Sequence, residues 1–267
     1  MSRNPRTAPR DQDHPPAVAG LTGTYREASP SAPLRAHFLC AWSSELAAGQ
    51  GGDVAVLPDG CVDILWAGGQ LSVVGPDVVA ARPQLAPGAR VLGLRFQPGA
   101  ARGWLGVPLS ELVGSRVGLD ALWGDRRAGR LARRLQDAAT QDAQMSALQQ
   151  GLMLEARAQQ APSVHAAALF RGFAAASEPS GGRVGGWLEL SERSLRRLSL
   201  DHFGYGPKML ERILRLQRFL GLLRQTPGAG LAALAAEARY ADQAHLSREI
   251  QALCGMTPSQ LRTQAGG

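Results

Sequence analysis

Three arginines stand close together in residues 188–204, LELSERSLRRLSLDHFG. Arg193, Arg196 and Arg197 carry planar guanidinium groups, which pair with phosphate oxygens and bind guanine O6 and N7 through two parallel hydrogen bonds. In a helix they project away from the face formed by residues at helical spacing, namely Leu195, Leu198, His202 and Phe203. The segment therefore predicts a helix that offers arginines to a nucleic acid, although a solvated helix face would explain any single arginine equally well.

A second segment, residues 231–255, repeats this layout about 50 residues later. The pattern predicts a short helix from Leu231, a turn at Arg239-Tyr240-Ala241, an N-cap at Asp242 and a second helix that ends at Gly255. Leu246, Ile250 and Leu253 form the apolar stripe of that second helix. The outward residues are Gln243, Ala244, Ser247 and Arg248, of which glutamine can bind adenine through two hydrogen bonds.

These side chains need elements that hold them in place. Ser191 and Gly204 stand where the N-cap and the C-terminal glycine of the first helix belong, and residues 183–190 predict a short helix and turn before it. A helix, a tight turn and a second helix form a helix-turn-helix unit. Pro207–Gln225 predicts one amphipathic helix between the two units, and Thr257-Pro-Ser-Gln260 is a capping box that opens a last helix. Within the joining helix, Arg212 and Arg215 could neutralise phosphates or solvate the surface.

Residues 183–262 resemble the C-terminal DNA-binding domain of AraC/XylS-type transcriptional regulators, most clearly in SERSLRRL–HFG, RLQRFLGLLR and YADQAHLSREIQALCGMTPSQLR. The resemblance implies that the helices after Ser191 and Asp242 are recognition helices that contact DNA through the outward residues named above. Two departures stand out. The family usually has Gly-Phe where this chain has Arg239-Tyr240, and its usual aromatics are absent at Ser199, Leu246 and Ile250.

The charge balance agrees with an acidic partner. The chain has 267 residues with 29 basic and 22 acidic side chains, a net charge of +7. Residues 183–267 hold 12 basic and 7 acidic residues, so +5 of the +7 lies in the last third. No apolar run is long enough to span a membrane, and the N-terminus lacks a secretory signal, so we expect a cytoplasmic protein. Three widely spaced cysteines predict neither a disulfide framework nor a metal site, and no cofactor is expected.

The N-terminal part has a different pattern of residues from the helical C-terminal part. We expect a flexible arm over residues 1–24, because this stretch is rich in Pro, Arg and Ala and poor in large apolar residues. Five short β-like runs between residues 34 and 97 predict a small barrel or sandwich, with a hairpin signal at Asp59-Gly60. Helices are predicted over 119–138, 144–160 and 164–176, and a linker over 178–182. The fold class is therefore α+β: an N-terminal β domain followed by helices (25–177), then an all-α double helix-turn-helix domain (183–267).

LPDGCVDILW and GLRFQPGAARGWLGVPLSEL resemble a domain of unassigned function often found ahead of AraC-type modules, over residues 25–124. Candidate ligand contacts are Trp42, Asp63, Trp66 and Arg95, since two tryptophans could line an apolar pocket while a charged group orients the ligand. In the alternative reading, the tryptophans are core residues and the aspartate caps a turn. Cys40 and Cys61 are open to three interpretations: inert core residues, a thiol sensor, or metal ligands with His37.

Together these patterns predict a sequence-specific DNA-binding transcription regulator, activator or repressor, that is not an enzyme. Its two recognition helices would read adjacent major-groove segments. The expected partner is a double-stranded DNA operator, and further candidates are a small-molecule effector, a second copy of the chain and RNA polymerase, with no membrane partner. The alternative is a DNA-targeted enzyme or thiol-based sensor that uses an N-terminal cysteine.

Overall fold

The structure is a computed structural model, and it describes residues 17–18, 23–47, 52–156, 159–175 and 188–265. The strands are β1 (Ala17–Val18), β2 (Thr24–Ala28), β3 (Phe38–Glu45), β4 (Gly52–Ala55), β5 (Asp63–Ala67), β6 (Gln70–Val74), β7 (Gln84–Leu85), β8 (Arg90–Phe96) and β9 (Arg116–Gly118). The helices are α1 (Ala101–Leu105), α2 (Leu119–Trp123), α3 (Asp125–Gln136), α4 (Gln141–Ala156), α5 (Val164–Ala175), α7 (Glu192–Phe203), α8 (Pro207–Gln225), α9 (Leu231–Glu237), α10 (Gln243–Cys254) and α11 (Pro258–Ala265), with 3-10 turns η1 (Ala32–Leu34) and η2 (Leu109–Glu111).

The N-terminal part is built on a six-stranded antiparallel sheet of order β2-β3-β8-β5-β6-β9. A smaller sheet, β1-β4-β7, lies beside it. Strands β5 and β6 are joined at Gly68-Gly69, whose φ values of 57° and 79° suit a tight hairpin turn. The predicted hairpin at Asp59-Gly60 is wrong, because β4 pairs with β1 and β7 and not with β5.

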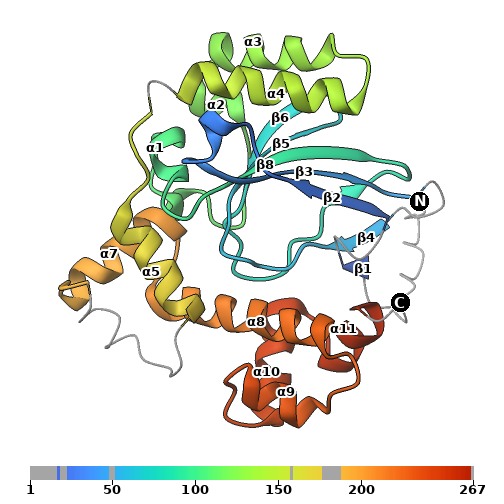
Figure 1. Cartoon of the computed structure of the whole chain (residues 1–267), viewed down its shortest axis with the longest axis vertical. Helices are drawn as coiled ribbons and strands as arrows, with labels where there is room; N and C mark the ends of the chain where they lie inside the picture. The colour runs from blue at the N-terminus through green and yellow to red at the C-terminus, as the bar shows by residue number, and fades with distance from the viewer. Residues whose placement is uncertain (1–16, 19–22, 48–51, 157–158, 176–187, 266–267) are drawn as a thin grey trace, which may run out of the picture.

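The two faces of the six-stranded sheet have different surroundings. Ile64 and Trp66 of β5 and Leu92 and Leu94 of β8 belong to a buried core that also contains residues of α1 to α4. Figure 1 shows α3 and α4 covering this face of the sheet, while the C-terminal helices lie beyond the opposite side. Because side chains alternate along a strand, Asp63 and Arg95 point to that opposite side.

The helices after the sheet depart from the sequence prediction in their boundaries. The expected helix 119–138 is two helices, α2 and α3, because Gly124 has φ 80° and ψ 150° between them. The expected helix 144–160 begins and ends earlier, at Gln141 and Ala156, while α5 agrees with its prediction to within one residue. Of the expected arm, Ala17–Val18 form β1 and Thr24 begins β2, whereas residues 1–16 lie outside the described ranges.

The C-terminal part consists of helices at the bounds that the caps predicted. The side chains of Ser191 and Asp242 accept hydrogen bonds from the backbone N–H groups of Ser194 and His245, while Gly204 and Gly255 end α7 and α10 in the left-handed conformation. The capping box is reciprocal: Gln260 N donates to Thr257 Oγ1 (3.2 Å), and Thr257 N donates to Gln260 Oε1 (2.8 Å). The predicted α+β class is thus confirmed. The predicted short helix at 183–190 lies mostly outside the described residues.

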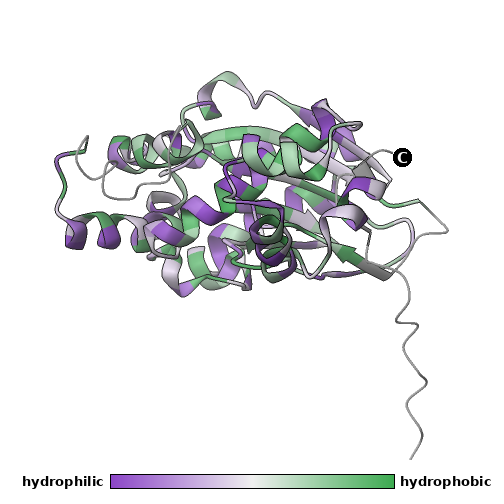
Figure 2. Cartoon of the chain, turned by 90° about the horizontal axis from the view of Figure 1, so that it is seen from below, coloured by the Kyte–Doolittle hydropathy of each residue, from purple (hydrophilic) through white to green (hydrophobic). Residues whose placement is uncertain are grey.

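Hydropathy alternates along the helices of Figure 2, with hydrophilic and hydrophobic residues on different sides of the same ribbon. This pattern is that of helices with one buried face. None of the helices in the described ranges has the length and apolar content needed to cross a membrane.

The C-terminal helices pack directly on the N-terminal part. Gln217 Nε2 donates to the Pro58 carbonyl (2.8 Å), and Ala80 N donates to the Leu253 carbonyl at the end of α10 (2.7 Å). Val18 of β1 is buried in the same apolar cluster as α8 to α11. These contacts join the N-terminal part to α8 and to the second helix-turn-helix unit.

Gly204 is where the first unit and the N-terminal part come closest. It has φ 83°, and an added Cβ would lie 2.6 Å from Val113 Cγ2 and 2.7 Å from Pro76 Cγ. We expect Gly204→Ala to lower the free energy of unfolding by about 2–4 kcal/mol through backbone strain and overpacking. Urea denaturation measures this. The matched control is Gly228→Ala, an exposed site with nothing within 4 Å, which should change stability by less than about 0.5 kcal/mol.

Candidate nucleic-acid interface

Helix α7 presents its three arginines to solvent. Leu195 and Phe203 are buried, while Arg193, Arg196 and Arg197 are exposed on the other side. No hydrogen bond or ion pair joins these guanidinium groups to any residue of the described ranges. Their full donor capacity is thus available for phosphate oxygens or base edges.

Helix α10 presents its polar residues in the same way. Gln243, Ala244 and Arg248 are exposed, and Ser247 is half-buried with its hydroxyl donating to the Gln243 carbonyl (2.9 Å). The Ser247 oxygen can still accept a hydrogen bond, but its proton is used within the helix.

His245 has a structural position at the start of the same helix. Its Nδ1 accepts a hydrogen bond from Ala241 N (3.2 Å), and its ring packs edge-on against Tyr240, with centroids 5.5 Å apart. The residue therefore holds the turn in front of α10 and is not directed at a partner.

Helix α8 joins the two units and belongs to the core of each. Its first half, with Leu210, Ile213 and Leu214, packs with α5 and α7. Its second half, with Leu216, Phe219 and Leu223, packs with α9, α10 and α11. With 19 residues, α8 is about 28 Å long, close to the roughly 34 Å that separates successive major-groove faces.

The arginines that α8 directs toward its neighbours have protein partners. Arg212 pairs with Glu249 through two hydrogen bonds (2.7 and 3.2 Å), and Arg215 pairs with Glu211 (2.8 Å). These charges stabilise the fold, so the phosphate alternative loses support for both residues.

The departures from the family pattern have local explanations. Ser199 is fully buried and donates its hydroxyl proton to the Tyr205 carbonyl (2.7 Å), which a side chain without a donor could not do. Leu246 and Ile250 are fully buried core residues. Tyr240 is buried with a hydroxyl that lacks a partner among the described residues, and burial raises the pKa of that hydroxyl.

On the N-terminal sheet, three of the four predicted ligand contacts come together. Arg95 donates from Nε and Nη2 to the two oxygens of Asp63 (3.2 and 3.3 Å), and Trp42 Nε1 donates to Asp63 Oδ1 (3.3 Å). Arg95 also pairs with Asp59 (3.2 Å), and Glu27 lies 4.0 Å away. We call these five residues the Arg95 cluster.

Trp66 is not part of this cluster. It is 5% exposed and lies in the core on the helix-covered face of the sheet, so the structure does not bring it together with the other three residues and gives its prediction as a ligand contact no support. Sequence reasoning placed Asp59 near a strand end but missed Glu27. The signal lay in β2, where Tyr25 and Glu27 are two residues apart and therefore share one face of the strand. Tyr25 donates to the Glu27 carboxylate, and its ring centroid lies 6.1 Å from that of Trp42.

The cysteines have environments that work against thiolate chemistry. Burial raises the pKa of Cys40 to about 11 and that of Cys254 to about 12, and it raises the pKa of Cys61 well above its ordinary value. Nearby carboxylates raise the pKa values of Cys40 and Cys61 further. Among the described residues, no group of His, Cys, Asp and Glu is arranged to hold a metal ion, which removes support for the His37–Cys40–Cys61 alternative.

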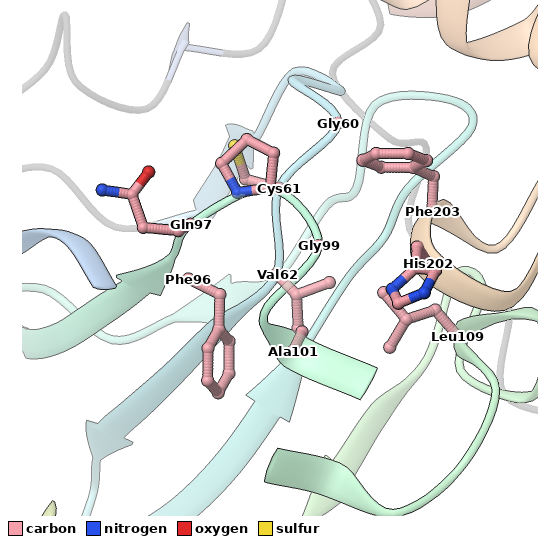
Figure 3. A pocket seen from close by; sticks show the side chains of 11 residues that line it. Gly60, Cys61, Val62, Phe96, Gln97, Gly99, Ala101, Leu109, His202 and Phe203 are labelled. Carbon is pink, nitrogen blue, oxygen red and sulfur yellow. The ribbon is translucent and has the colours of Figure 1, made fainter. Parts of the chain in front are cut away.

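A cavity at the junction of the two parts is shown in Figure 3. Cys61, Val62 and Phe96 approach it from the sheet, and His202 and Phe203 from the end of α7. Its volume of about 10 Å³ is roughly that of one water molecule, so it is not a ligand pocket in this conformation. His202 Nδ1 is buried without a partner in the described chain, and burial lowers the pKa of this histidine.

Comparison with known proteins gives two family matches. Residues 187–264 match a family described as a helix-turn-helix domain, and residues 26–118 match a family described as a domain of unknown function, DUF6597. No curated protein matches the chain significantly.

Solved structures of ToxT from Vibrio cholerae are similar to the chain. An apo ToxT variant from strain SCE256 is 12% identical over 85% of this chain and 97% of its own, with a TM-score of 0.46. Unsaturated fatty acid bound wild-type ToxT from the same strain is 10% identical over 85% and 95%, with a TM-score of 0.45. ToxT from strain O395 is 10% identical over 79% and 88%, with a TM-score of 0.43.

Asp77 gives a pH test of the loop next to the Arg95 cluster. Burial, and then the charges of Asp59 and Asp63, raise its pKa to about 6. The folded state therefore binds a proton that the unfolded state has already lost, and stability falls as the pH rises from about 4 to about 6. We expect Asp77→Asn to be more stable than wild type above pH 6, by about 1 kcal/mol after allowance for solvent screening.

Urea midpoints of wild type and variant across this pH range measure the difference. The control is Gln136→Ala, at an exposed site without an ionisable side chain, and its difference from wild type should not depend on pH. A constant difference between wild type and Asp77→Asn would contradict the assignment.

Proposed function

The chain carries a C-terminal helix-turn-helix domain of the AraC/XylS type behind an N-terminal DUF6597 domain, and from this premise we propose that it is a sequence-specific transcription regulator that reads two successive major-groove segments. The observation that supports the proposal is the placement of α7 and α10 on either half of α8, each with an unpaired arginine on its outer face. A shared helix fixes the spacing of the two recognition helices, which would let one chain contact one face of the DNA.

The outer faces suit base reading as well as phosphate binding. The guanidinium groups on α7 and Arg248 on α10 can bind guanine O6 and N7, Gln243 can bind adenine, and the Ala244 methyl can contact the methyl group of thymine. We propose that Arg193, Arg196, Arg197, Gln243, Ala244, Ser247 and Arg248 make the DNA contacts. Since the partner is DNA, we place the action of the protein in the cytoplasm.

The alternative of a DNA-targeted enzyme or thiol sensor has little support. Neither matched family is described as an enzyme. A reactive cysteine needs a lowered pKa, whereas burial raises the pKa of Cys40 and Cys61.

We further propose that the N-terminal part controls DNA binding through the Arg95 cluster. Asp59 of this cluster follows Pro58, whose carbonyl accepts a hydrogen bond from Gln217 on α8. Gly60 lies close to the same helix, because a Cβ added to it would be 3.5 Å from Leu210 Cδ1. A small effector that competes for Arg95 or Asp63 would release Asp59 and so alter the contact between this loop and the linker helix. A second copy of the chain and RNA polymerase remain predicted partners.

The division at residues 177–183 is also a proposal, and α5 bears on it. Ala166, Leu169 and Phe173 of α5 are buried with residues of α7 and α8. The last helix before the boundary therefore packs as part of the first helix-turn-helix unit, so a fragment used to study DNA binding alone should begin before Val164.

Loss of one arginine from each outer face tests the DNA interface. We expect Arg196→Ala and Arg248→Ala each to weaken binding to the duplex that the wild-type protein selects from a random pool by about 5- to 100-fold, the cost of one bidentate base contact. Fluorescence anisotropy at fixed salt measures the affinity.

The matched control is Arg133→Ala, an exposed arginine on α3, which lies on the side of the sheet away from α10. It should bind as wild type. If both recognition-helix variants also bind as wild type, the assigned faces are wrong.

Removal of the Arg95 guanidinium tests control through the N-terminal part. Arg95→Met leaves Asp59 and Asp63 without their cation, so their repulsion should loosen the loop that contacts α8. We expect faster amide hydrogen exchange in residues 58–62 and 207–217. Arg90→Met, which removes an exposed pair with Glu45, should not change either segment. Unchanged exchange in α8 of Arg95→Met would contradict the coupling.

A further inference from the structure

The turn between α9 and α10 contains a strained arginine. Arg239 has φ 69°, a left-handed conformation that disfavours every residue with a Cβ. Tyr240 N donates to the Ala235 carbonyl and Arg239 N to the Ala236 carbonyl, the two hydrogen bonds of a Schellman motif. In this motif the left-handed position is usually a glycine.

Other helices of the same domain end without such strain. Gly204 after α7 and Gly255 after α10 take φ values of 83° and 67°. The sequence thus supplies glycine at two left-handed helix ends and an arginine at the third. Since backbone strain at one residue often accompanies a functional role for its side chain, the Arg239 guanidinium needs an explanation of its own.

The Arg239 guanidinium lies close to other positive charges. Arg218 of α8 is near it, because burial, and then the charges of Arg239 and Arg215, lower the pKa of Arg218. Arg215 lies over the ring of the next residue, Tyr240, at 5.6 Å from the ring centroid. Arg215 is paired with Glu211, and Arg218 donates to the Ala174 carbonyl. Arg239 is half-exposed and makes no hydrogen bond or ion pair with a residue in the described part of the chain. Because Arg239 has no ion-pair partner of its own in the described chain, its repulsion by Arg218 favours the approach of an anion.

The position of Arg239 in the fold indicates which anion would bind it. It stands three residues before Asp242, the N-cap of α10, in the turn that leads into the second recognition helix. The N-terminal residues of a recognition helix lie against the base edges, and groups just in front of them lie beside the sugar-phosphate backbone.

We propose that Arg239 clamps a DNA phosphate beside the bases read by α10, and that its backbone strain is retained for this contact. The inference rests on the proposed function, because it requires that α10 enters the major groove. It adds a residue outside both recognition helices that sets the register of the second unit on DNA without reading sequence.

The first unit offers a matched control. Glu189 also has a positive φ, 52°, and it stands two residues before the N-cap Ser191 of α7. It carries a carboxylate, which a phosphate repels. Glu189→Gly and Arg239→Gly therefore relieve the same kind of strain and remove opposite charges.

The experiment uses the full chain and two duplexes: the one that the wild-type protein selects from a random pool, and a scrambled duplex of the same composition. Affinity is measured against salt from about 50 to 200 mM, a range over which phosphate contacts dominate the change. Arg239→Gly should bind both duplexes about fivefold more weakly, with a log–log salt slope smaller in magnitude by about 0.9, the contribution of one phosphate. Its melting temperature should equal or exceed that of wild type, because the strain is gone.

Two further variants separate charge from backbone. Arg239→Lys keeps the charge on the same backbone, so its salt slope should match that of wild type. Glu189→Gly should melt no lower than wild type and bind both duplexes at least as tightly.

Each of the following outcomes would overturn one of the two proposals. An unchanged salt slope in Arg239→Gly, a loss confined to the selected duplex, or a lower melting temperature overturns the phosphate clamp, since each assigns Arg239 another role. Equal weakening by Glu189→Gly also overturns it, because the loss would then come from the backbone change. Selection of no duplex by the wild-type protein would instead overturn the proposed function.

Discussion

The burial of α8 in two apolar cores is the constraint on which the rest of the structure depends. Leu210 and Ile213 complete the core of the first unit, and Phe219 and Leu223 complete that of the second. Neither unit buries its apolar face without this helix. Any motion of one recognition helix relative to the other must bend α8 or repack one of the two cores, and both changes are costly because protein interiors are closely packed. A fixed spacing between α7 and α10 is therefore a consequence of packing and not of a stiff linker sequence alone.

The same helix is also where the N-terminal part meets the DNA-binding part. The Pro58 carbonyl accepts a hydrogen bond from Gln217 on α8, and the Ala80 N–H donates to the Leu253 carbonyl in α10. Gly204 at the end of α7 lies against Val113 and Pro76, so the N-terminal part contacts the first unit as well as the second. Under the proposed control by an effector, a change in the sheet would act on the position of the whole double unit and would require no rearrangement inside a helix-turn-helix unit.

Much of the C-terminal domain could be predicted because its determinants are local. Ser191, Asp242 and the Thr257–Gln260 pair act within three residues of themselves, and helical spacing alone separates Leu195 from Arg196. The errors arose where the answer depends on pairing across the sequence. Trp66 and Asp63 are three residues apart in one strand, so alternation already places them on opposite faces, but only the packing of α1 to α4 decides which of the two faces is covered. The ion pair between Arg212 and Glu249 spans 37 residues, so spacing on α8 could not distinguish a structural arginine from a phosphate contact.

Arginine has four different roles in this chain, and their comparison explains why total charge is a weak guide to function. Arg95 is surrounded by carboxylates and mostly buried, so its charge is neutralised within the protein, where it holds strand ends and a loop together. Arg212 crosses from α8 to α10 and holds the second unit in place. Arg193, Arg196, Arg197 and Arg248 are exposed without a described partner, and only such groups can exchange water and counterions for DNA at little cost. Arg239 differs from all of these because its place is unfavourable twice, through its backbone and through its charged neighbours. Arg239 thus lowers the stability of the free protein through both its backbone and its charge. Such a residue is best explained by a state in which the repulsion is relieved, and beside a recognition helix that state is the complex with DNA.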